Sequence, residues 1–242
     1  MSDVIERIAI ELARATDGAT AWRATEVIDL ARDSARHGVR AVAFGGEPLA
    51  FAGVLDVLEA LRGVVDRSLT TDGRLLDGQL APLVRAAPDA VWVVLHQPGH
   101  PPEVARVIRQ VGALQAVGIA SSLAVVVRAS RVDDALRTAA HAREAGIDDE
   151  RIMYLPAPDD SPPPARATAR ADDTPLARAS ASRACSAACM ARPRVAALGW
   201  DKHAAWCPHT RSPRPLAAPT HVALVAALAA LGLEPEQRHV AH

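Results

Sequence analysis

Aromatic residues are scarce in this 242-residue chain, which has four Trp, two Phe and one Tyr. Because 50% of the residues are nevertheless hydrophobic, alanine, valine and leucine must build the interior, as is usual where helices pack on a central sheet. Net charge is also nearly absent, at -1, so the chain lacks the global field that attracts nucleic acid or an anionic membrane. We therefore expect no nucleic-acid partner and no membrane partner.

Long apolar runs are missing as well. No uncharged stretch is long enough to cross a bilayer. The first residues, MSDVIERIAIELARA, are acidic and lack the basic n-region and apolar h-region of a signal peptide. These two absences predict a cytoplasmic protein.

Cysteine is absent from the first 184 residues. The three that follow, Cys185, Cys189 and Cys207, are an odd number, which suits a metal or cluster site better than a secreted disulfide framework. Three thiolates can bind a [4Fe-4S] cluster with one open iron, and His209 or His203 could complete that site or a zinc site. Reduced free thiols are the alternative.

What the sequence does contain is an alternation of short β-branched runs with longer Ala-, Leu- and Arg-rich stretches of helical period. This alternation is typical of repeated βα units and a parallel sheet. Glycines close several of the helical stretches, and a left-handed cap is expected at Gly38. We expect strands near 7–13, 40–44, 67–71, 90–96, 119–127 and 151–156, with helices near 23–37, 51–63, 78–87, 102–117 and 132–145. The stretch 7–13 also fits a helical stripe.

The composition changes after residue 156. Residues 157–183 are rich in Pro, Ala and Arg and predict a linker or loop. In the extension 184–242 we expect two short strands about a turn at GWDK (199–202), and then a helix opened by the N-cap Thr220. The sequence thus predicts an α/β protein with a small C-terminal hairpin-helix extension.

The segment AVAFGGEPLA sets two glycines, a glutamate and a proline directly after an apolar run. In parallel α/β sheets, ligands bind outside the carboxyl ends of the strands. Gly45 and Gly46 would let a ligand approach the main chain, Glu47 could accept a hydrogen bond from an ammonium group, and Pro48 would stiffen the exit. A tight turn with a solvated glutamate is the other interpretation.

The order of these features resembles the core of the radical S-adenosylmethionine (radical SAM) superfamily over roughly residues 7–156. GGEP after the second strand is the most specific element. The resemblance implies a partial (β/α)6 barrel of mostly parallel strands over residues 1–156. It also implies that Gly45, Gly46, Glu47 and Pro48 hold the amino group of S-adenosylmethionine. Polar residues near later strands would face the same cavity by position: Thr70, Thr71, His96, Ser122 and Arg128.

The chain departs from the family at its defining motif. That motif is a CxxxCxxC loop after the first strand, which holds a [4Fe-4S] cluster, but the corresponding segment ARATDGATAWRA offers only Asp17. The segment before Cys207 resembles the auxiliary-cluster extensions of the family, which points to Cys185, Cys189, Cys207 and His209 as a metal site.

Three hypotheses follow from these observations. One is a radical-SAM-like protein that uses a C-terminal cluster and an external reductant to modify a peptide or small molecule. Another is a pseudoenzyme that has lost the catalytic cluster and acts as a binding or partner subunit. The third is an unrelated α/β barrel enzyme. No G-x-S-x-G, Walker A, H-E-x-x-H or G-x-G-x-x-G segment is present, so hydrolase, NTPase, metalloprotease and nicotinamide-binding functions are not supported.

Overall fold

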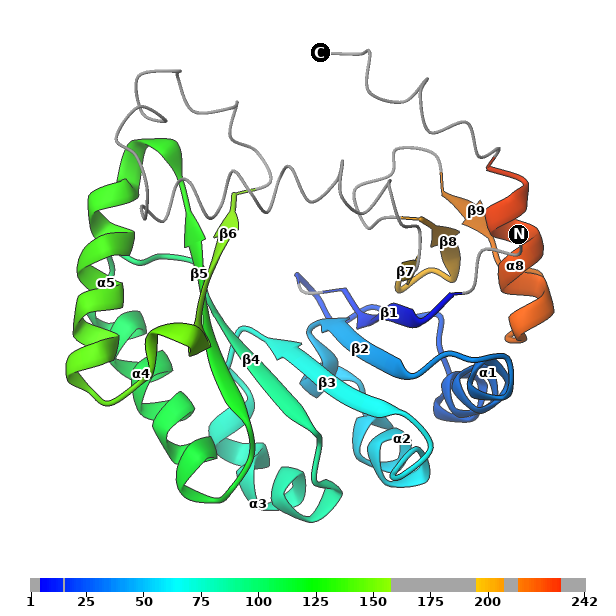
Figure 1. Cartoon of the computed structure of the whole chain (residues 1–242), viewed down its shortest axis with the longest axis horizontal. Coiled ribbons are helices and arrows are strands. Elements are labelled where there is room, and N and C mark those ends of the chain that lie inside the picture. Colours follow the sequence, from blue (N-terminus) through cyan, green and yellow to red (C-terminus); the bar gives the residue numbers. More distant parts are fainter. Residues whose placement is uncertain (1–4, 15, 158–194, 207–212, 232–242) are drawn as a thin grey trace. The chain divides into compact units, whose positions relative to one another are not determined.

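The computed structural model describes residues 5–14, 16–157, 195–206 and 213–231 (Figure 1). The chain divides into two compact units. The first comprises Met1–Thr70, Ala81–Asp89 and Ala188–His242, and the second comprises Thr71–Leu80 and Ala90–Ala187. None of the helices in the described ranges is both long and apolar enough to span a bilayer.

The sheet of the first unit has the strand order β3-β2-β1-β7-β8-β9. Neighbouring strands from β3 to β7 are parallel, whereas β8 pairs antiparallel with β7 and β9 antiparallel with β8. The strands are β1 (Arg7–Ala13), β2 (Ala41–Gly46), β3 (Asp66–Thr71), β7 (Val195–Leu198), β8 (His203–Ala205) and β9 (Arg214–Pro215).

The side chains of β1 alternate between two environments. Ile8, Ile10 and Leu12 are fully buried, whereas Ala9 and Glu11 lie on the opposite, more open face. This alternation confirms the strand interpretation of residues 7–13 over the helical one. The helices of this unit are α1 (Ala24–Arg36), the short 3-10 helix η1 (Pro48–Ala50), α2 (Val54–Ala60) and α8 (His221–Ala229); Figure 1 shows α1 and α2 on the same side of β1 and β2.

One buried arginine joins several elements of the first unit. Arg67 in β3 is only 3% exposed. Its guanidinium donates to the carbonyls of Leu58 (2.6 Å) and Ala87 (2.7 Å) and to the carboxylate of Asp89 (3.0 Å). Burial pushes the pKa of Asp89 upward, but the hydrogen bonds from Arg67 outweigh it and lower that pKa. The arginine therefore ties the end of α2 to the segment before β4.

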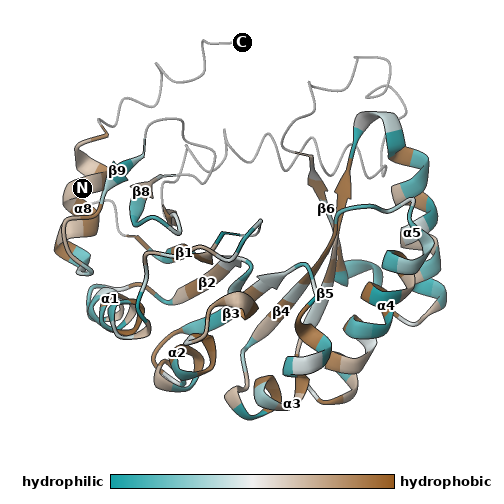
Figure 2. Cartoon of the chain, turned by 180° about the vertical axis from the view of Figure 1, so that it is seen from behind, coloured by the Kyte–Doolittle hydropathy of each residue, from teal (hydrophilic) through white to brown (hydrophobic). Residues whose placement is uncertain are grey.

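The second unit contains a parallel sheet in the order β4-β5-β6. Its strands are β4 (Ala90–Leu95), β5 (Ser121–Val127) and β6 (Ile152–Pro156), and its helices are α4 (Pro101–Ala116) and α5 (Val132–Glu144). The helix α3 (Leu76–Ala86) begins in the second unit and ends in the first. Figure 2 shows hydrophobic strands and helices α4 and α5 of mixed hydropathy, as expected of helices with one buried face.

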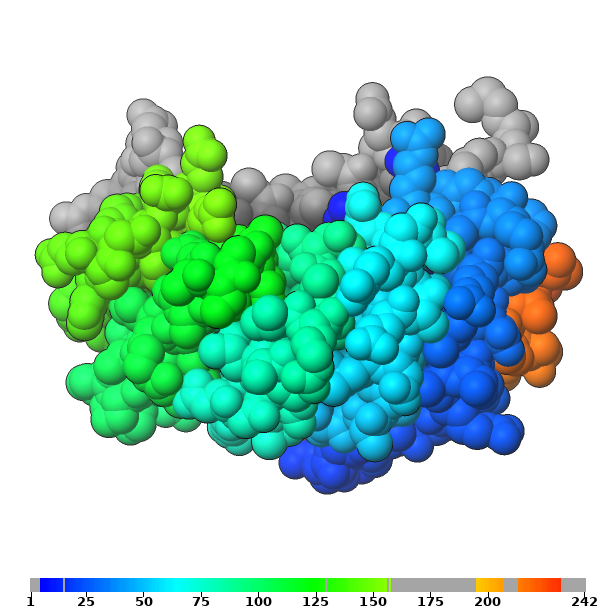
Figure 3. Space-filling view, turned by 90° about the horizontal axis from the view of Figure 1, so that it is seen from below, coloured from blue at the N-terminus to red at the C-terminus, as the bar shows by residue number. Residues whose placement is uncertain are grey.

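The structure confirms the predicted class, α/β with mostly parallel strands that alternate with helices. Gly38 has φ +98° directly after α1, as a left-handed cap requires. In the extension, β7 and β8 form the predicted hairpin about 199–202. The Thr220 hydroxyl accepts a hydrogen bond from the amide of Ala223 (3.2 Å) at the start of α8, and the surface of α8 adjoins that of the N-terminal region (Figure 3).

Candidate functional site

The two glycines that end β2 differ in what the fold requires of them. Gly46 has φ +73°, and a Cβ there would lie 2.0 Å from the carbonyl oxygen of Ala13. The next amide, that of Glu47, donates to the same oxygen at 3.1 Å. At Gly45, by contrast, a Cβ would meet no atom within 4 Å. The fold therefore demands glycine at position 46, whereas position 45 faces open space.

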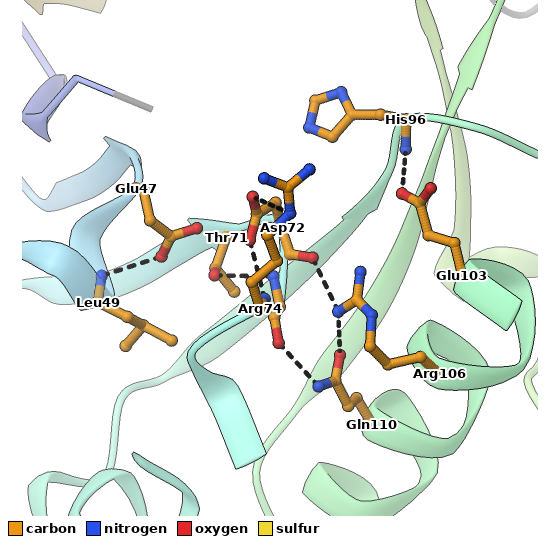
Figure 4. A network of polar contacts seen from close by, with 10 residues as sticks. Glu47, Leu49, Thr71, Asp72, Arg74, His96, Glu103, Arg106 and Gln110 are labelled. Carbon is orange, nitrogen blue, oxygen red and sulfur yellow. Dashed lines mark hydrogen bonds and ion pairs between the residues drawn. The ribbon is translucent and has the colours of Figure 1, made fainter. Parts of the chain in front are cut away.

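Glu47 and Pro48 form the tight exit from β2. Glu47 is 5% exposed, and its Oε1 accepts a hydrogen bond from the amide of Leu49 at 3.1 Å (Figure 4). Pro48 is buried in the first turn of η1, where its missing N–H costs no hydrogen bond. Glu47 thus caps this turn, and its contact with an ammonium group stays a prediction.

A cavity of about 290 Å³ opens beside Gly45, at the carboxyl ends of β1, β2 and β7. Thr70 of β3 and Gly46 also line it. Four of its lining residues are the alanines Ala9, Ala43, Ala197 and Ala205. Ala9 is the register partner of both Ala43 and Ala197, so these small side chains lie side by side across three strands. Their short side chains leave the space above the sheet open.

Three titratable side chains line the same cavity: Glu11 of β1, Asp201 of the hairpin turn and His203 of β8. His203 Nδ1 lies 3.2 Å from Asp201 Oδ2, so the two form an ion pair when the imidazole is protonated. Burial raises the pKa of Glu11, and the charge of Asp201 raises it further, while a hydrogen bond from the Trp200 amide opposes the shift. These contributions make the ionised form of Glu11 less favourable at the cavity than it is in water.

Sequence reasoning did not select Glu11 or Asp201. The alternation of RIAIELA did place Glu11 opposite the three apolar side chains of β1. What it could not show is that β7 pairs with β1 and that the hairpin turn brings Asp201 beside Glu11, because that pairing joins segments nearly 190 residues apart.

The second unit holds a further pocket, about 370 Å³ in volume. It is lined by His96, Gln97 and Pro98 after β4 and by Arg128 and Arg131 after β5. The structure thus brings together two predicted residues, His96 and Arg128, and adds Arg131, which follows Arg128 by three positions. Two guanidinium groups and an imidazole suit an anionic group such as a carboxylate or phosphate.

Two other predicted residues lie apart from these pockets. Thr71 is 1% exposed, and its hydroxyl accepts a hydrogen bond from the amide of Gly73 at 3.0 Å. Nearby, Gln110 donates to the carbonyl of Gly73 and accepts from Arg106 (Figure 4). Ser122 pairs with Trp92 in the first half of β5 and lines neither pocket.

The loop between β1 and α1 is where the family holds its cluster. Here the guanidinium of Arg14 pairs with the carboxylate of Asp17, which also accepts from the amide of Ala19 at 3.0 Å. These contacts and the left-handed Gly18 (φ +71°) close a tight turn. Asp17, the one ligand candidate in this loop, is therefore already paired, and the described residues of the loop do not fit an iron-sulfur cluster.

The same loop is packed against the C-terminal hairpin. Trp22 is buried, and its indole N–H donates to the carbonyl of Gly199 at 3.0 Å. The Arg14 guanidinium lies 4.6 Å from the centre of the Trp200 ring, and Lys202 Nζ lies 2.8 Å from both carboxylate oxygens of Glu26. Gly199, Trp200 and Lys202 of the hairpin turn thus contact the loop and the start of α1.

The predicted metal ligands Cys185, Cys189, Cys207 and His209 lie outside the described residues. Within the described ranges, no group of three or more His, Cys, Asp or Glu side chains could hold a metal ion.

Comparison with known proteins gave likenesses that cover part of the chain. No family model matches. A segment of 94 residues is 37% identical to the probable GTP 3',8-cyclase of Thermococcus kodakarensis. This segment is 38% of this chain and 30% of the cyclase.

Two solved structures share the fold at 15% sequence identity and a TM-score of 0.50. They are anSMEcpe with bound AdoMet (S-adenosylmethionine) and the same protein with bound AdoMet and the Kp18Cys peptide. Each likeness covers 62% of this chain and about half of the solved chain, 49% and 51% respectively. This likeness matches the fold class expected of a partial (β/α)6 barrel. The fold agrees with the resemblance drawn from the sequence, which rests on GGEP at 45–48 and departs from the radical SAM family in the missing N-terminal CxxxCxxC.

Proposed function

We propose that this chain is a radical-SAM-type protein that binds S-adenosylmethionine through the cavity beside Gly45. The observation that carries the proposal is Gly45 itself. Neither its backbone conformation nor any neighbouring atom requires a glycine there, and the place of its missing side chain is open space at the cavity. A ligand that approaches the main chain would explain the glycine.

The fold likeness to a protein solved with bound AdoMet supports the identity of this ligand. The match spans about half of that protein's chain, so a like activity or substrate is only a proposal for this chain. All the cofactor contacts expected from the sequence stay predictions: Gly45, Gly46, Glu47, Pro48, Thr70, Thr71, His96, Ser122 and Arg128.

The form of this function that fits the described residues is a binding or partner subunit without the core cluster. The loop after β1 supplies no cluster ligands and is closed by Arg14 and Asp17. Such a subunit would bind the cofactor without cleaving it.

A second candidate is favoured by the three cysteines at 185, 189 and 207. With His209 they would hold a [4Fe-4S] cluster, or zinc. The chain would then modify a peptide or a small molecule with the help of an external reductant. The structure of anSMEcpe with the Kp18Cys peptide supports a peptide as the substrate class.

Calorimetric titration with S-adenosylmethionine tests the binding function. Saturable binding to the wild type is expected, with at least tenfold weaker binding to Gly45→Leu, whose side chain would fill the cavity. Gly112→Leu is the matched control, because Gly112 of α4 is exposed and also has no atom within 4 Å of its Cβ position. A wild type that fails to bind the cofactor contradicts the proposal and favours the unrelated α/β barrel enzyme.

Anaerobic reconstitution with iron and sulfide separates the two candidates. Iron content, visible charge-transfer absorbance and 5'-deoxyadenosine formation with dithionite are measured on the wild type and on a Cys185→Ala, Cys189→Ala, Cys207→Ala variant. A cluster and 5'-deoxyadenosine in the wild type alone support the enzyme. Cofactor binding without a cluster supports the binding subunit.

A further inference from the structure

Glu11 lies on the more exposed face of β1 and lines the cavity. Its register partner in β2 is Gly45. On the other side, Leu198 pairs with Ile10, and Gly199 follows directly after Leu198. Glu11, Gly45 and Gly199 all line the cavity of about 290 Å³. Glu11 therefore has a glycine on each side, and its carboxylate accepts a hydrogen bond from the amide of Trp200.

The hairpin places a second carboxylate in this cavity. A Cβ on Gly199 would lie 2.6 Å from Asp201 Oδ1, so the glycine makes room for Asp201. His203 donates its backbone N–H to the same oxygen at 3.2 Å. The hairpin turn is thus built to hold the Asp201 carboxylate in place at the cavity.

Among the described residues, no fixed positive charge lines the cavity beside these two carboxylates. Among the described residues that line the cavity, none is a lysine or an arginine, and His203 is the sole titratable base. The nearest basic residues along the chain are engaged elsewhere, since Arg14 pairs with Asp17 and Lys202 pairs with Glu26. Two carboxylates at one cavity repel each other unless a cation lies between them.

We propose that Glu11 and Asp201 bind the primary ammonium group of the ligand that occupies this cavity. The inference deepens the proposed function and rests on it for the identity of the natural ligand. The ammonium belongs either to the amino-acid end of S-adenosylmethionine or to a separate amine substrate. The alanines at 9, 43, 197 and 205 would contact the apolar part next to the amine.

The pH dependence of binding follows from the groups that face Glu11. These are Asp201 and His203 from the hairpin, whereas β2 and β3 supply Gly45 and Thr70, which do not titrate. Glu11 must lose its proton to attract a cation, and its pKa is raised mainly by burial and then by Asp201. Affinity for an amine should therefore increase as the pH rises through a range above that of an ordinary glutamate.

An amide-resolved NMR titration of the full chain with n-butylammonium tests the site without any cofactor. Saturable shifts are expected at the amides of Gly45, Gly199 and Trp200, and 1-butanol, the neutral isostere, should not cause them. Glu11→Gln and Asp201→Asn should each weaken n-butylammonium binding at least tenfold. Glu59→Gln, on the exposed face of α2, should leave it unchanged. Equal shifts with butanol, or equal affinity in Glu11→Gln and Glu59→Gln, would overturn the proposal.

S-adenosylmethionine then identifies the source of the ammonium. Competition between the cofactor and n-butylammonium, with weaker cofactor binding to Glu11→Gln, assigns the site to the cofactor. Simultaneous binding of both assigns it to a separate amine substrate. If the cofactor does not bind to the wild type, the proposed function fails, while the n-butylammonium titration still decides the ammonium site by itself.

Discussion

At the scale of single residues, Gly45 and Gly46 are glycine for different reasons. Position 46 combines a left-handed backbone with contact to the Ala13 carbonyl, whereas position 45 has neither constraint. The fold itself therefore requires a glycine only at position 46. The ligand that we propose for the cavity would explain the glycine at position 45.

Substitution by alanine should separate the two roles. Gly46→Ala should destabilise the fold by at least about 2 kcal/mol, because the new methyl group clashes with main chain and the backbone is strained. Gly45→Ala should change the unfolding free energy by less than about 0.5 kcal/mol, as other unconstrained sites do. Urea unfolding followed by circular dichroism measures both values. A Gly45→Ala loss as large as that of Gly46→Ala would mean that the fold itself needs the first glycine.

The raised pKa of Glu11 predicts that the stability of the protein depends on pH. A carboxyl group whose pKa is raised in the folded state stabilises the protein below its unfolded pKa and loses that contribution as the pH rises through the folded pKa. Glu11→Gln should therefore stabilise the protein at pH 7, by up to about 1 kcal/mol because solvent in the cavity screens the charge. At pH values below the ordinary range of glutamate, the two proteins should unfold alike. Urea titrations at both pH values measure the difference, and a destabilised Glu11→Gln at pH 7 would contradict the prediction.

At the scale of elements, Arg67 of β3 joins α2 to the segment before β4. It satisfies the carbonyls at the end of α2 and before β4 from inside the protein. Arg67→Met should remove these hydrogen bonds and leave buried carbonyl oxygens unpaired, at a cost of about 3 kcal/mol or more. Arg74→Met is the matched control, because Arg74 is exposed and pairs with Asp72 at the surface. Similar midpoints of urea unfolding for the two variants would show that Arg67 does not hold these elements together.

The contact between α1 and α8 should depend on pH. His37 and His221 stack with ring centres 4.5 Å apart, and the amide of His221 donates to Asp33 at 2.8 Å. Burial, and then the charge of His37, lowers the pKa of His221, although Asp33 opposes the shift. The folded state thus binds a proton on His221 less readily than the unfolded state.

Stability contributed by this contact is therefore complete above the unfolded pKa of histidine and decreases as the pH falls toward the lower folded pKa. We expect the unfolding free energy to drop by up to about 1 kcal/mol between pH 7.5 and 5.5. His221→Gln should reduce that drop, and His141→Gln, a change at an exposed position in α5, should not. Equal pH profiles for the two variants would refute the role of the stacked pair.

At the scale of the whole molecule, cofactor binding should not require the cysteines. The proposed binding site is built around Gly45 from residues of β1, β2, β7 and the hairpin. S-adenosylmethionine at about 100 times its dissociation constant should raise the unfolding free energy by about 2.7 kcal/mol. Thermal unfolding should show equal increases for the wild type and the triple Cys→Ala variant. An increase confined to the wild type would place the cysteines in the cofactor site.

Local patterns in the sequence were sufficient to predict most of the fold. The alternation in 7–13, the glycine cap at Gly38, the turn at 199–202 and the N-cap Thr220 each depend on neighbours within a few residues, and the structure confirms them. The pairing of β7 with β1 depends on segments far apart in the chain, so no local pattern could indicate it.

The candidate site was less predictable for the same reason. GGEP located Gly45, because a glycine pair after a strand is visible in the sequence. Whether a polar side chain faces a cavity depends on strand position and on neighbouring strands. Ser122 lies in the first half of β5, whereas Arg131 lies just beyond its end, and composition alone does not distinguish them.

The packing of Trp22 against the hairpin turn limits attempts to engineer redox activity into this chain. A CxxxCxxC motif written into residues 14–23 would supply thiols, but it would enter a loop that is held by the Trp22 contact with Gly199, the Arg14–Trp200 contact and the Arg14–Asp17 pair. A successful graft would first have to remove or re-route the hairpin. That change would also remove Asp201 and His203. The proposed ammonium site and an installed cluster would therefore exclude each other.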